Sequence, residues 1–213
     1  MTDIIVALLI AVALTPIIFM VVFIRHTGRI PEWTRKLLLR MVYKRMAQPW
    51  DRRIPPETTT PVYMLRWWVW RLRWFSSCYI NNVLRSDDDR ALHDHPWWNI
   101  SIVLLGGYWE WGPKWMGPVP GPYVPSRLAW RGPGSVVIRR RARWLHRLEL
   151  DPNKAKQETI SLFLTGPAMR RWGFRVPETG EWIDARDWES HLAATGQAPG
   201  TIGRTRDQFS EDE

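Results

Sequence analysis

Residues 85–110 read RSDDDRALHDHPWWNISIVLLGGYWE, and this stretch decides the fold. It contains two histidines one residue apart, His93 and His95, followed by the apolar run 99–105. In an extended strand, residues i and i+2 point to the same face, so both imidazoles are expected to converge while Asp94 points away. Two imidazoles that converge on one point are typical of part of a metal site.

A third histidine, His146, lies in the alternating segment 144–150 (WLHRLEL), which predicts a strand. Three imidazoles brought together from two strands would form a metal site with open positions for water or substrate. A cation held by three neutral ligands keeps its full charge, which favours a small anionic ligand or an acidic bound water. The residues therefore predict a divalent metal bound by His93, His95 and His146.

The surrounding chain predicts a mainly β domain. Short runs of strand formers separated by Gly/Pro turns lie at 62–75, 99–105, 135–138, 144–150 and 158–164. Such spacing with little helix signal is typical of an antiparallel sandwich or barrel. Residues 111–125 contain five prolines and three glycines and predict a long loop.

The string His93-x-His95-x₃-Asn99-x₆-Gly106 has the spacing of the first cupin motif, H-x-H-x₃-E-x₆-G. On this string the chain resembles the cupin superfamily, the RmlC-like jelly rolls. It is most similar to uncharacterised cupin-like proteins of phages and bacteria with related sequences at 85–98, 104–110, 164–167 and 170–174. The resemblance covers residues 79–188, about half of the chain. It implies a double-stranded β-helix, a jelly-roll barrel with a divalent metal in its mouth, and it allows a homodimer.

The chain departs from the cupin pattern in both motifs. Asn99 replaces the glutamate ligand, which leaves a three-histidine site like that of cupins resembling thiol dioxygenases. In the second motif His146 matches the histidine, while Arg141 and Arg143 stand in place of proline and glycine. Iron(II) is the favoured metal for oxygen chemistry, and zinc, manganese and nickel are the alternatives, because ligand type alone does not choose among them.

Further residues near the motifs are candidates for chemistry or ligand binding. Tyr108 and Glu110 alternate on the predicted strand after Gly107 and could form a general acid/base pair, or Glu110 could lie at the surface. Arg141 and Arg143 belong to a run of arginines that either clamps a carboxylate or phosphate or forms a solvated basic surface.

Asn99, Trp98 and Trp172 are the remaining candidates for ligand binding. Asn99 occupies the position of the missing carboxylate, so its amide would face the ligand. Trp98 and Trp172 flank the motifs, where they either stack on a ring of the ligand or pack in the core.

Residues 4–24 form 21 consecutive positions without a charge, long enough at about 1.5 Å per residue to cross a bilayer as a helix. The preceding residues lack a positive charge and no small-x-small site follows, which argues against a cleaved signal peptide. The positive flank that follows predicts a single-pass orientation with the C-terminal domain in the cytoplasm. Membrane lipids are therefore expected partners, and nucleic acid is not.

The sequence divides into five segments. They are a transmembrane anchor at 1–25, a basic juxtamembrane helix at 26–47, a Pro-rich linker at 48–61, a cupin barrel at 62–190 and a polar, disordered tail at 191–213. The basic helix would either lie on anionic headgroups or pack on its own domain. With 213 residues, 45% of them apolar, a net charge of +9 and one cysteine, the chain is no disulfide scaffold and no disordered polymer.

Three functions from different classes remain open at this stage. The first is a membrane-tethered, metal-dependent enzyme that carries out oxygen-dependent, dioxygenase-like chemistry or hydrolysis on a small anionic molecule. The second is a non-catalytic cupin that binds a small ligand or a partner at the membrane. The third is a metal-independent sugar-nucleotide epimerase or isomerase with His95 as base and Tyr108 as acid.

Overall fold

The structure is a computed structural model that describes residues 2–54, 62–72, 75–87, 91–151 and 158–196, with side chains from Thr15 onward. The helices are α1 (Thr2–Thr27), α2 (Glu32–Met46) and α3 (Trp188–Ala194). The strands are β1 (Arg52–Ile54), β2 (Met64–Leu72), β3 (Ser76–Val83), β4 (Leu92–His93), β5 (Asn99–Leu105), β6 (Tyr108–Trp115), β7 (Tyr123–Arg131), β8 (Val136–Arg139), β9 (Arg147–Leu150), β10 (Thr159–Thr165), β11 (Gly173–Arg175) and β12 (Trp182–Asp184).

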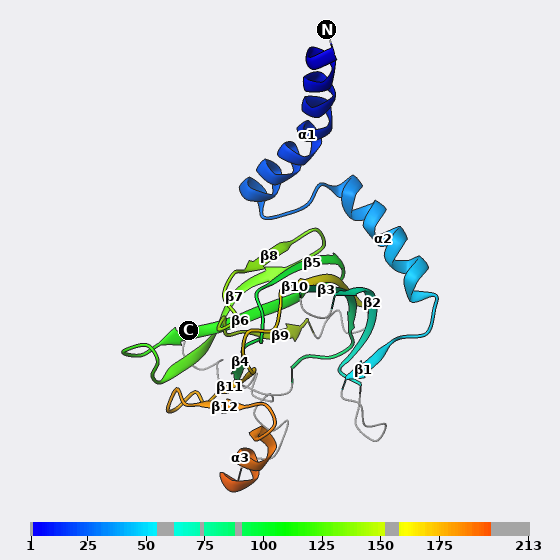
Figure 1. The fold of residues 1–213 in the computed structure, drawn as a ribbon. Helices are drawn as coiled ribbons and strands as arrows, with labels where there is room; N and C mark the ends of the chain where they lie inside the picture. Colours follow the sequence, from blue (N-terminus) through cyan, green and yellow to red (C-terminus); the bar gives the residue numbers. More distant parts are fainter. Residues whose placement is uncertain (1, 55–61, 73–74, 88–90, 152–157, 197–213) are drawn as a thin grey trace.

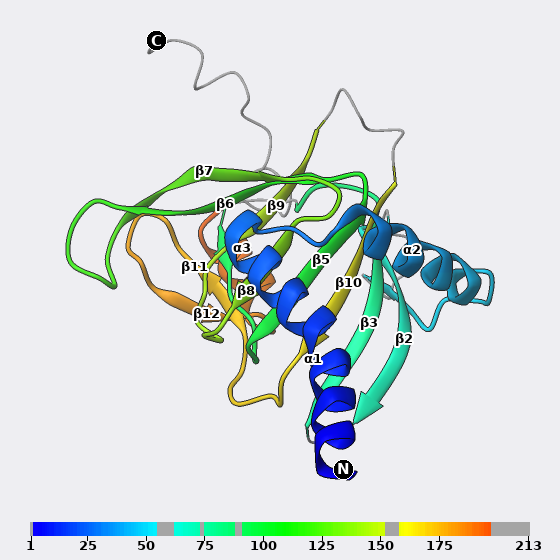
Figure 2. The same ribbon diagram turned by 90° about the horizontal axis from the view of Figure 1, so that it is seen from above.

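These strands form three antiparallel sheets, as Figures 1 and 2 show. The largest sheet has the order β1-β2-β3-β10-β5-β8, and the two smaller sheets have the orders β7-β6-β9 and β12-β11-β4. Strand β10 pairs with both β3 and β5, so segments far apart in the sequence lie side by side. The described chain is therefore mainly β with antiparallel pairing, as the sequence predicts.

Helix α2 covers the outer face of the six-stranded sheet. Its buried Val42 joins a cluster that contains Trp67 of β2, Ile80 of β3 and Ile160 of β10. Because side chains alternate along a strand, the neighbours of these residues point to the opposite face of the sheet. Packing on the outer face thus fixes which side chains face inward, toward the other two sheets.

Helix α1 extends away from the sheets, with the start of the chain at its far end (Figure 1). Where α1 ends, the backbone joins the barrel: Val136 N–H donates to Gly28 O at 2.8 Å, and Ile30 N–H donates to Gly134 O at 2.9 Å. The predicted membrane segment, residues 4–24, lies on this helix, and its side chains before Thr15 are outside the described part. Among the described residues, no helix is long and apolar enough to cross a membrane.

Two boundaries differ from the sequence-based expectations. In the predicted linker 48–61, residues 52–54 form β1 and pair with β2, while 55–61 lie outside the described residues. In the predicted tail 191–213, the first residues complete α3, where Leu192 is 1% exposed, and 197–213 are outside the described residues. A buried leucine explains why this helix holds onto the domain.

The predicted loop at 111–125 is largely a two-stranded ribbon, so that prediction is wrong. Strands β6 and β7 continue their pairing through Pro113 opposite Pro125, as far as Trp115 opposite Tyr123. Proline is tolerated where no neighbouring strand needs its missing N–H. Strand β9 pairs with β6 only from Tyr108 to Trp111, so Pro113 lies beyond that second neighbour.

Candidate metal centre

The three histidines are brought together by backbone pairing. His93 ends β4 and forms a bridge with His146, in which each N–H donates to the other carbonyl at 3.0 Å. His95 N–H donates to Ala142 O at 3.1 Å, and Asp94 N–H donates in the opposite direction, to Gly173 O at 3.0 Å. This extended backbone turns His93 and His95 to one side, although only two residues of the segment belong to a strand.

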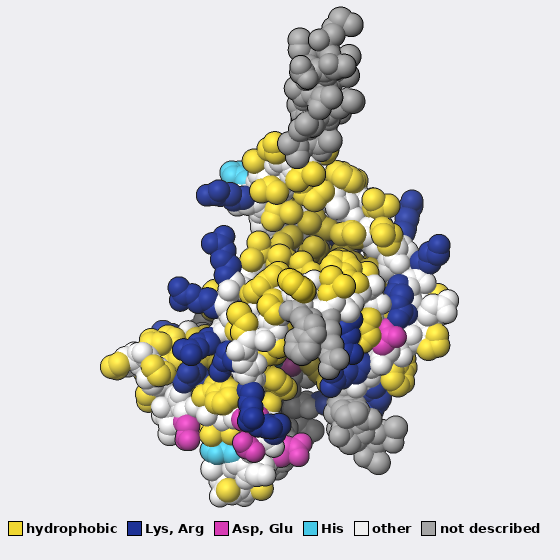
Figure 3. Space-filling model, in the orientation of Figure 1, with side chains coloured by type: hydrophobic (Ala, Val, Ile, Leu, Met, Phe, Trp, Pro, Cys, Tyr) yellow, Lys and Arg dark blue, Asp and Glu magenta, His cyan; other side chains and the backbone are white. Residues whose placement is uncertain are grey.

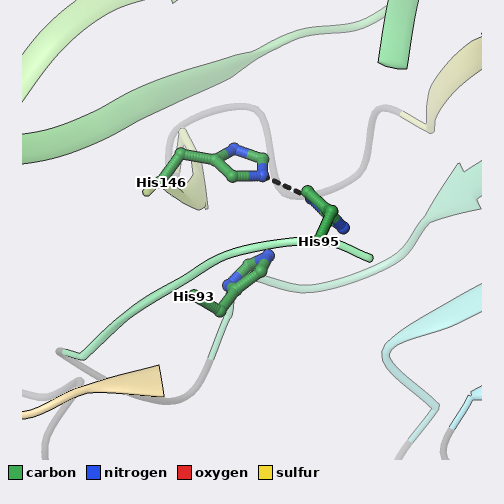
Figure 4. Close-up of side chains that lie close together, drawn as sticks. All are labelled: His93, His95 and His146. Carbon is green, nitrogen blue, oxygen red and sulfur yellow. Dashed lines mark hydrogen bonds between the residues drawn. The ribbon is translucent and has the colours of Figure 1, made fainter. Parts of the chain in front are cut away.

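The three rings face a common space (Figure 4). Their centroids lie 5.3 Å apart for His93 and His95, 4.8 Å for His93 and His146, and 5.0 Å for His95 and His146. The Nε2 atoms of His95 and His146 are 2.7 Å apart, so one ring donates its proton to the lone pair of the other. One nitrogen from each ring lies within 4.8 Å of the others, which groups the three as candidate ligands of a metal ion.

The environment keeps two of these rings neutral. His146 is 3% exposed, and His93 and His95 are half-buried. Burial lowers the pKa of His95 well below that of a free imidazole, and His93 and Arg139 act in the same direction. Burial also lowers the pKa of His146, followed by the positive charge of Arg139. Neutral imidazole is the form that binds metals, so His95 and His146 are in the right protonation state.

A buried carboxylate, Asp94, holds the outer side of the histidine segment. Its Oδ1 accepts a hydrogen bond from Gly173 N–H at 2.9 Å, and its Oδ2 accepts one from Trp182 Nε1–H at 3.1 Å and another from Arg170. Asp94 is 2% exposed. The side chain between the two histidines therefore points away from the site and ties it to β11 and β12.

A second buried carboxylate, Glu110 of β6, lies behind His146. It accepts hydrogen bonds from Arg139 Nη2 and, at 2.7 Å, from Arg131 Nε. Arg139 Nη1 also donates to Asn99 Oδ1 at 3.1 Å. Glu110, Arg139 and Asn99 are each 1% exposed. Glu110 Oε1 lies 3.8 Å from His146 Nδ1, which makes no hydrogen bond within the described residues.

The histidines line a cavity of about 470 Å³ between the sheets. One side of the cavity, here called the histidine wall, consists of His93, His95 and His146 with Trp172 and Phe174. The opposite side, here called the sheet wall, is the inner face of β1, β2, β3 and β10. Among the described residues that line the cavity, four are arginines and one is a carboxylate: Arg52, Arg66, Arg85, Arg139 and Asp87.

The sheet wall carries rows of side chains in ladder register. One row runs across Arg52, Arg66, Asn81 and Ser161. A second row contains Tyr79 and Phe163, which are direct partners on β3 and β10 and whose rings stack at 5.3 Å. Phe163 lies 6.1 Å from the ring of His95, so the aromatic row reaches the histidine wall.

The structure places the predicted ligand-binding and catalytic residues in three groups. Tyr108 and Trp172 line the cavity, and the ring of Trp172 lies 6.3 Å from that of His93. Asn99 and Glu110 lie behind the histidines in the buried arginine network. Residues outside the cavity lining are the exposed Arg141 and Arg143 and the half-buried Trp98.

Several cavity residues were not singled out by the sequence. Arg66 lies in the predicted strand run 62–75, while Tyr79 on β3 lies outside every predicted run, and no motif marks which face of these strands is inward. Asp87 precedes the histidines, and its carboxylate accepts hydrogen bonds from Leu148 N–H at 2.7 Å and from the Tyr63 hydroxyl. Burial, with Asp87 close by, raises the pKa of Tyr63 well above its usual value.

Comparison with known proteins gives structural matches only. The sequence matches no protein-family model and no curated protein. Similar solved structures include iron(II) HppE, with 14% identity, a TM-score of 0.38 and coverage of 55% of this chain and 54% of HppE, so the chain spans about half the length of HppE. They also include a cupin-like protein from Thermotoga maritima, with 14% identity, a TM-score of 0.37 and coverage of 69% and 96%. A third is an RmlC-like cupin protein from Ralstonia eutropha, with 12% identity, a TM-score of 0.36 and coverage of 71% and 85%.

Proposed function

We propose that this chain is a cupin-type protein that binds a divalent metal through His93, His95 and His146 and acts on or binds a small anionic molecule. The observation that carries the proposal is the convergence of three imidazoles on a cavity of about 470 Å³. Iron(II) is the metal we favour, with zinc, manganese or nickel as alternatives. When bound, such an ion would supply Lewis-acid or redox chemistry at the open positions that three ligands leave.

The donor set fits a metal ion. Buried neutral imidazoles are good nitrogen ligands, and two of the three have lowered pKa values. One of the two Nε2 atoms of His95 and His146 carries the shared proton, and that proton would have to move to Nδ1 of its own ring for both Nε2 atoms to hold one cation. Glu110, close to His146 Nδ1, supplies negative charge behind this ligand, as carboxylates often do in metal sites.

The chain's own residues can prepare a ligand in the cavity. The aromatic residues Trp97, Phe163, Trp172 and Phe174 surround the histidines and exclude water from their faces. Tyr108 is 2% exposed and lines the same cavity, so its hydroxyl can donate a proton to a bound ligand. The excess of arginines over carboxylates favours an anion.

Metal content of the purified chain tests this proposal. We expect close to one divalent ion per chain by elemental analysis, and loss of most of it in His93→Ala and His146→Ala. The exposed His26→Ala variant, on α1, is the matched control and should retain the metal. Circular dichroism checks that each variant is folded, and His93→Gln provides a less disruptive substitution. Full metal content in folded His93→Gln and His146→Ala would contradict the three-histidine centre; a metal-free chain whose melting temperature rises with a small ligand supports the non-catalytic alternative.

We also propose that the protein attaches to membranes, with residues 4–24 as a single-pass span and the C-terminal domain on the cytoplasmic side. The described part of α1 exposes Ile17, Phe19 and Val22 by 57–59%, which is costly in water. Helix α2 exposes Trp33, Leu37 and Met41 beside the exposed cations Lys36, Arg40 and Lys44. Figure 3 shows the hydrophobic patch where these helices meet, with cations around it.

Flotation on a density gradient tests membrane attachment. The full chain should float with vesicles of phosphatidylcholine and phosphatidylserine, and protease added outside inverted membrane vesicles should digest the barrel. A variant with Phe19→Lys and Val22→Lys should float less. Recovery of the full chain in the unbound fraction without detergent would contradict attachment.

A further inference from the structure

One row of the sheet wall places two arginines directly opposite each other. Arg66 of β2 is the register partner of Arg52 on β1 and of Asn81 on β3, and Asn81 is in turn opposite Ser161 on β10. All four line the cavity. Cross-strand partners present their side chains on the same face, so two guanidiniums, an amide and a hydroxyl share one strip of the wall.

Neutralising partners for these cations are absent from the described residues. Like charges directly opposite in a sheet are destabilising. No described carboxylate forms an ion pair with Arg66. Asp87, which lines the cavity, accepts hydrogen bonds from Tyr63 and Leu148, and Glu110, behind the histidines, accepts them from Arg131 and Arg139. Burial lowers the pKa of Arg66, and the charge of Arg52 adds to this effect.

The guanidinium of Arg66 is nevertheless held firmly in place. Its Nε donates to Asn81 Oδ1 at 2.9 Å, and its Cζ lies 4.0 Å above the centre of the Tyr79 ring. Neither contact removes its charge. Arg66 Nη2 also lies 3.7 Å from Met64 Sδ, a weak acceptor. A fixed guanidinium whose N–H groups are not engaged by a described carboxylate is suited to a planar or tetrahedral oxyanion, because its donors form a rigid fork.

We propose that Arg66, with Arg52 at the open rim and Asn81 and Ser161 beside it, forms an oxyanion subsite for the carboxylate or phosphate group of the ligand. This inference rests on the proposed function and specifies which end of the ligand is anionic. Tyr79 stacks between Arg66 and Phe163, and Phe163 adjoins His95. A ligand anchored on Arg66 would therefore lay its uncharged part along the aromatic row, with its far end toward the histidines.

Binding of simple anions to the full chain in detergent micelles tests the subsite. Inorganic phosphate and propanoate are titrated separately by calorimetry at constant ionic strength, into metal-loaded and into chelator-treated protein. We expect saturable binding of at least one anion, weakened at least tenfold in Arg66→Gln in both preparations. Arg66→Lys should show a smaller loss, because an ammonium keeps the charge but not the fork. The matched control is Arg71→Gln, an exposed arginine on the same strand outside the cavity, which should bind as the wild type does.

Metal content separates this inference from the proposed function. Arg66→Gln should retain the wild-type metal content, because Arg66 is not among the candidate ligands. The subsite is overturned if neither anion binds saturably, or if Arg66→Gln binds as tightly as the wild type. A chain that binds no metal but shows Arg66-dependent anion binding would overturn the metal centre and support the subsite.

Discussion

The two walls of the cavity are held in shape by different interactions. In the sheet wall, backbone ladders set the position of each side chain, and Arg66, Tyr79 and Phe163 follow from strand register. Of the three histidines in the histidine wall, only His93 belongs to a strand, and a single bridge connects it to His146. The backbone therefore holds the histidines through a few hydrogen bonds only, and the buried side-chain bonds of Asp94 and Glu110 add support that a substitution can remove.

This contrast predicts that replacing a polar residue behind the histidine wall lowers stability more than replacing a polar residue in the sheet wall. In the sheet wall, many backbone hydrogen bonds together keep the strands in place. Asp94 and Glu110, in contrast, each satisfy several buried donors alone. The following substitutions are ordered from the largest expected effect to the smallest.

The largest effect is expected for Glu110→Gln. The amide keeps the shape of the carboxylate but leaves Arg139, 1% exposed, without its counter-charge. Breaking a buried ion pair in this way costs about 3–5 kcal/mol, measured as a loss in the free energy of unfolding by urea titration. Metal affinity should also fall by about tenfold or more, because Glu110 supports His146.

The matched control is Glu149→Gln. This side chain is 27% exposed; it pairs with the exposed Arg127 at 3.4 Å and, more loosely, with Arg147 at 3.6 Å. Such pairs contribute about 0–1 kcal/mol, so stability and metal affinity should change little. Equal effects of the two substitutions would show that the network behind His146 is not what maintains the histidine wall.

A smaller loss is expected for Asp94→Ala. The substitution leaves Gly173 N–H and Trp182 Nε1–H without their acceptor, and each buried unsatisfied donor costs about 1–3 kcal/mol. We expect a total of about 3 kcal/mol in urea unfolding.

On the sheet wall, Asn81→Ala removes one hydrogen bond to Arg66 and should cost about 1 kcal/mol. The comparison between the walls fails if Asn81→Ala is the more damaging of the two.

The sequence predicts the three histidines of the histidine wall, but of the sheet wall it predicts only the runs that form β2 and β10. The runs of strand formers at 99–105 and 158–164 indicated strands, and the structure confirms β5 and β10 there. The three histidines were predicted to form one site, from the spacing of His93 and His95 and from the likeness of His146 to a cupin ligand. The structure groups them. The spacing of His93 and His95 suffices to place both rings on one side, because neighbours along an extended chain determine it. His146 was reached through its predicted strand and through the resemblance to the cupin motif.

The remaining features depend on contacts between distant segments. The pairing of Arg52 with Arg66 crosses a Pro-rich segment that was expected to contribute no strand. Burial of Glu110 requires Arg131 and Arg139, from β7 and β8, and no local pattern announces that its charge is balanced. Likewise, the run of arginines at 139–147 could not reveal that Arg139 is buried while Arg141 and Arg143 are exposed.

A modest effect is expected where one hydroxyl joins the two smaller sheets. Tyr123 of β7 donates to Arg175 O at 2.7 Å and accepts from Leu92 N–H at 3.2 Å. Tyr123→Phe keeps the buried ring and should cost about 1 kcal/mol in thermal or urea unfolding. Metal content should be unchanged, since His93 keeps its own backbone bridge to His146. Loss of metal in this variant would indicate that the position of β4 depends on the tyrosine more than on the bridge.

The smallest effect, and one of opposite sign, is expected for Arg52→Gln. Arg52 is exposed and lies directly opposite Arg66, so removing its charge relieves a cross-strand repulsion. In low-salt buffer without multivalent anions, the variant should be more stable than the wild type by about 0.2–1 kcal/mol. The difference should shrink as salt screens the charges. Added phosphate should stabilise the wild type more than Arg52→Gln, because the wild type has two guanidiniums that attract a bound oxyanion and the variant has one. A variant that is less stable than the wild type at every salt concentration would mean that Arg52 has a structural role in the sheet wall, and the pairing of the two arginines would then carry no implication for anion binding.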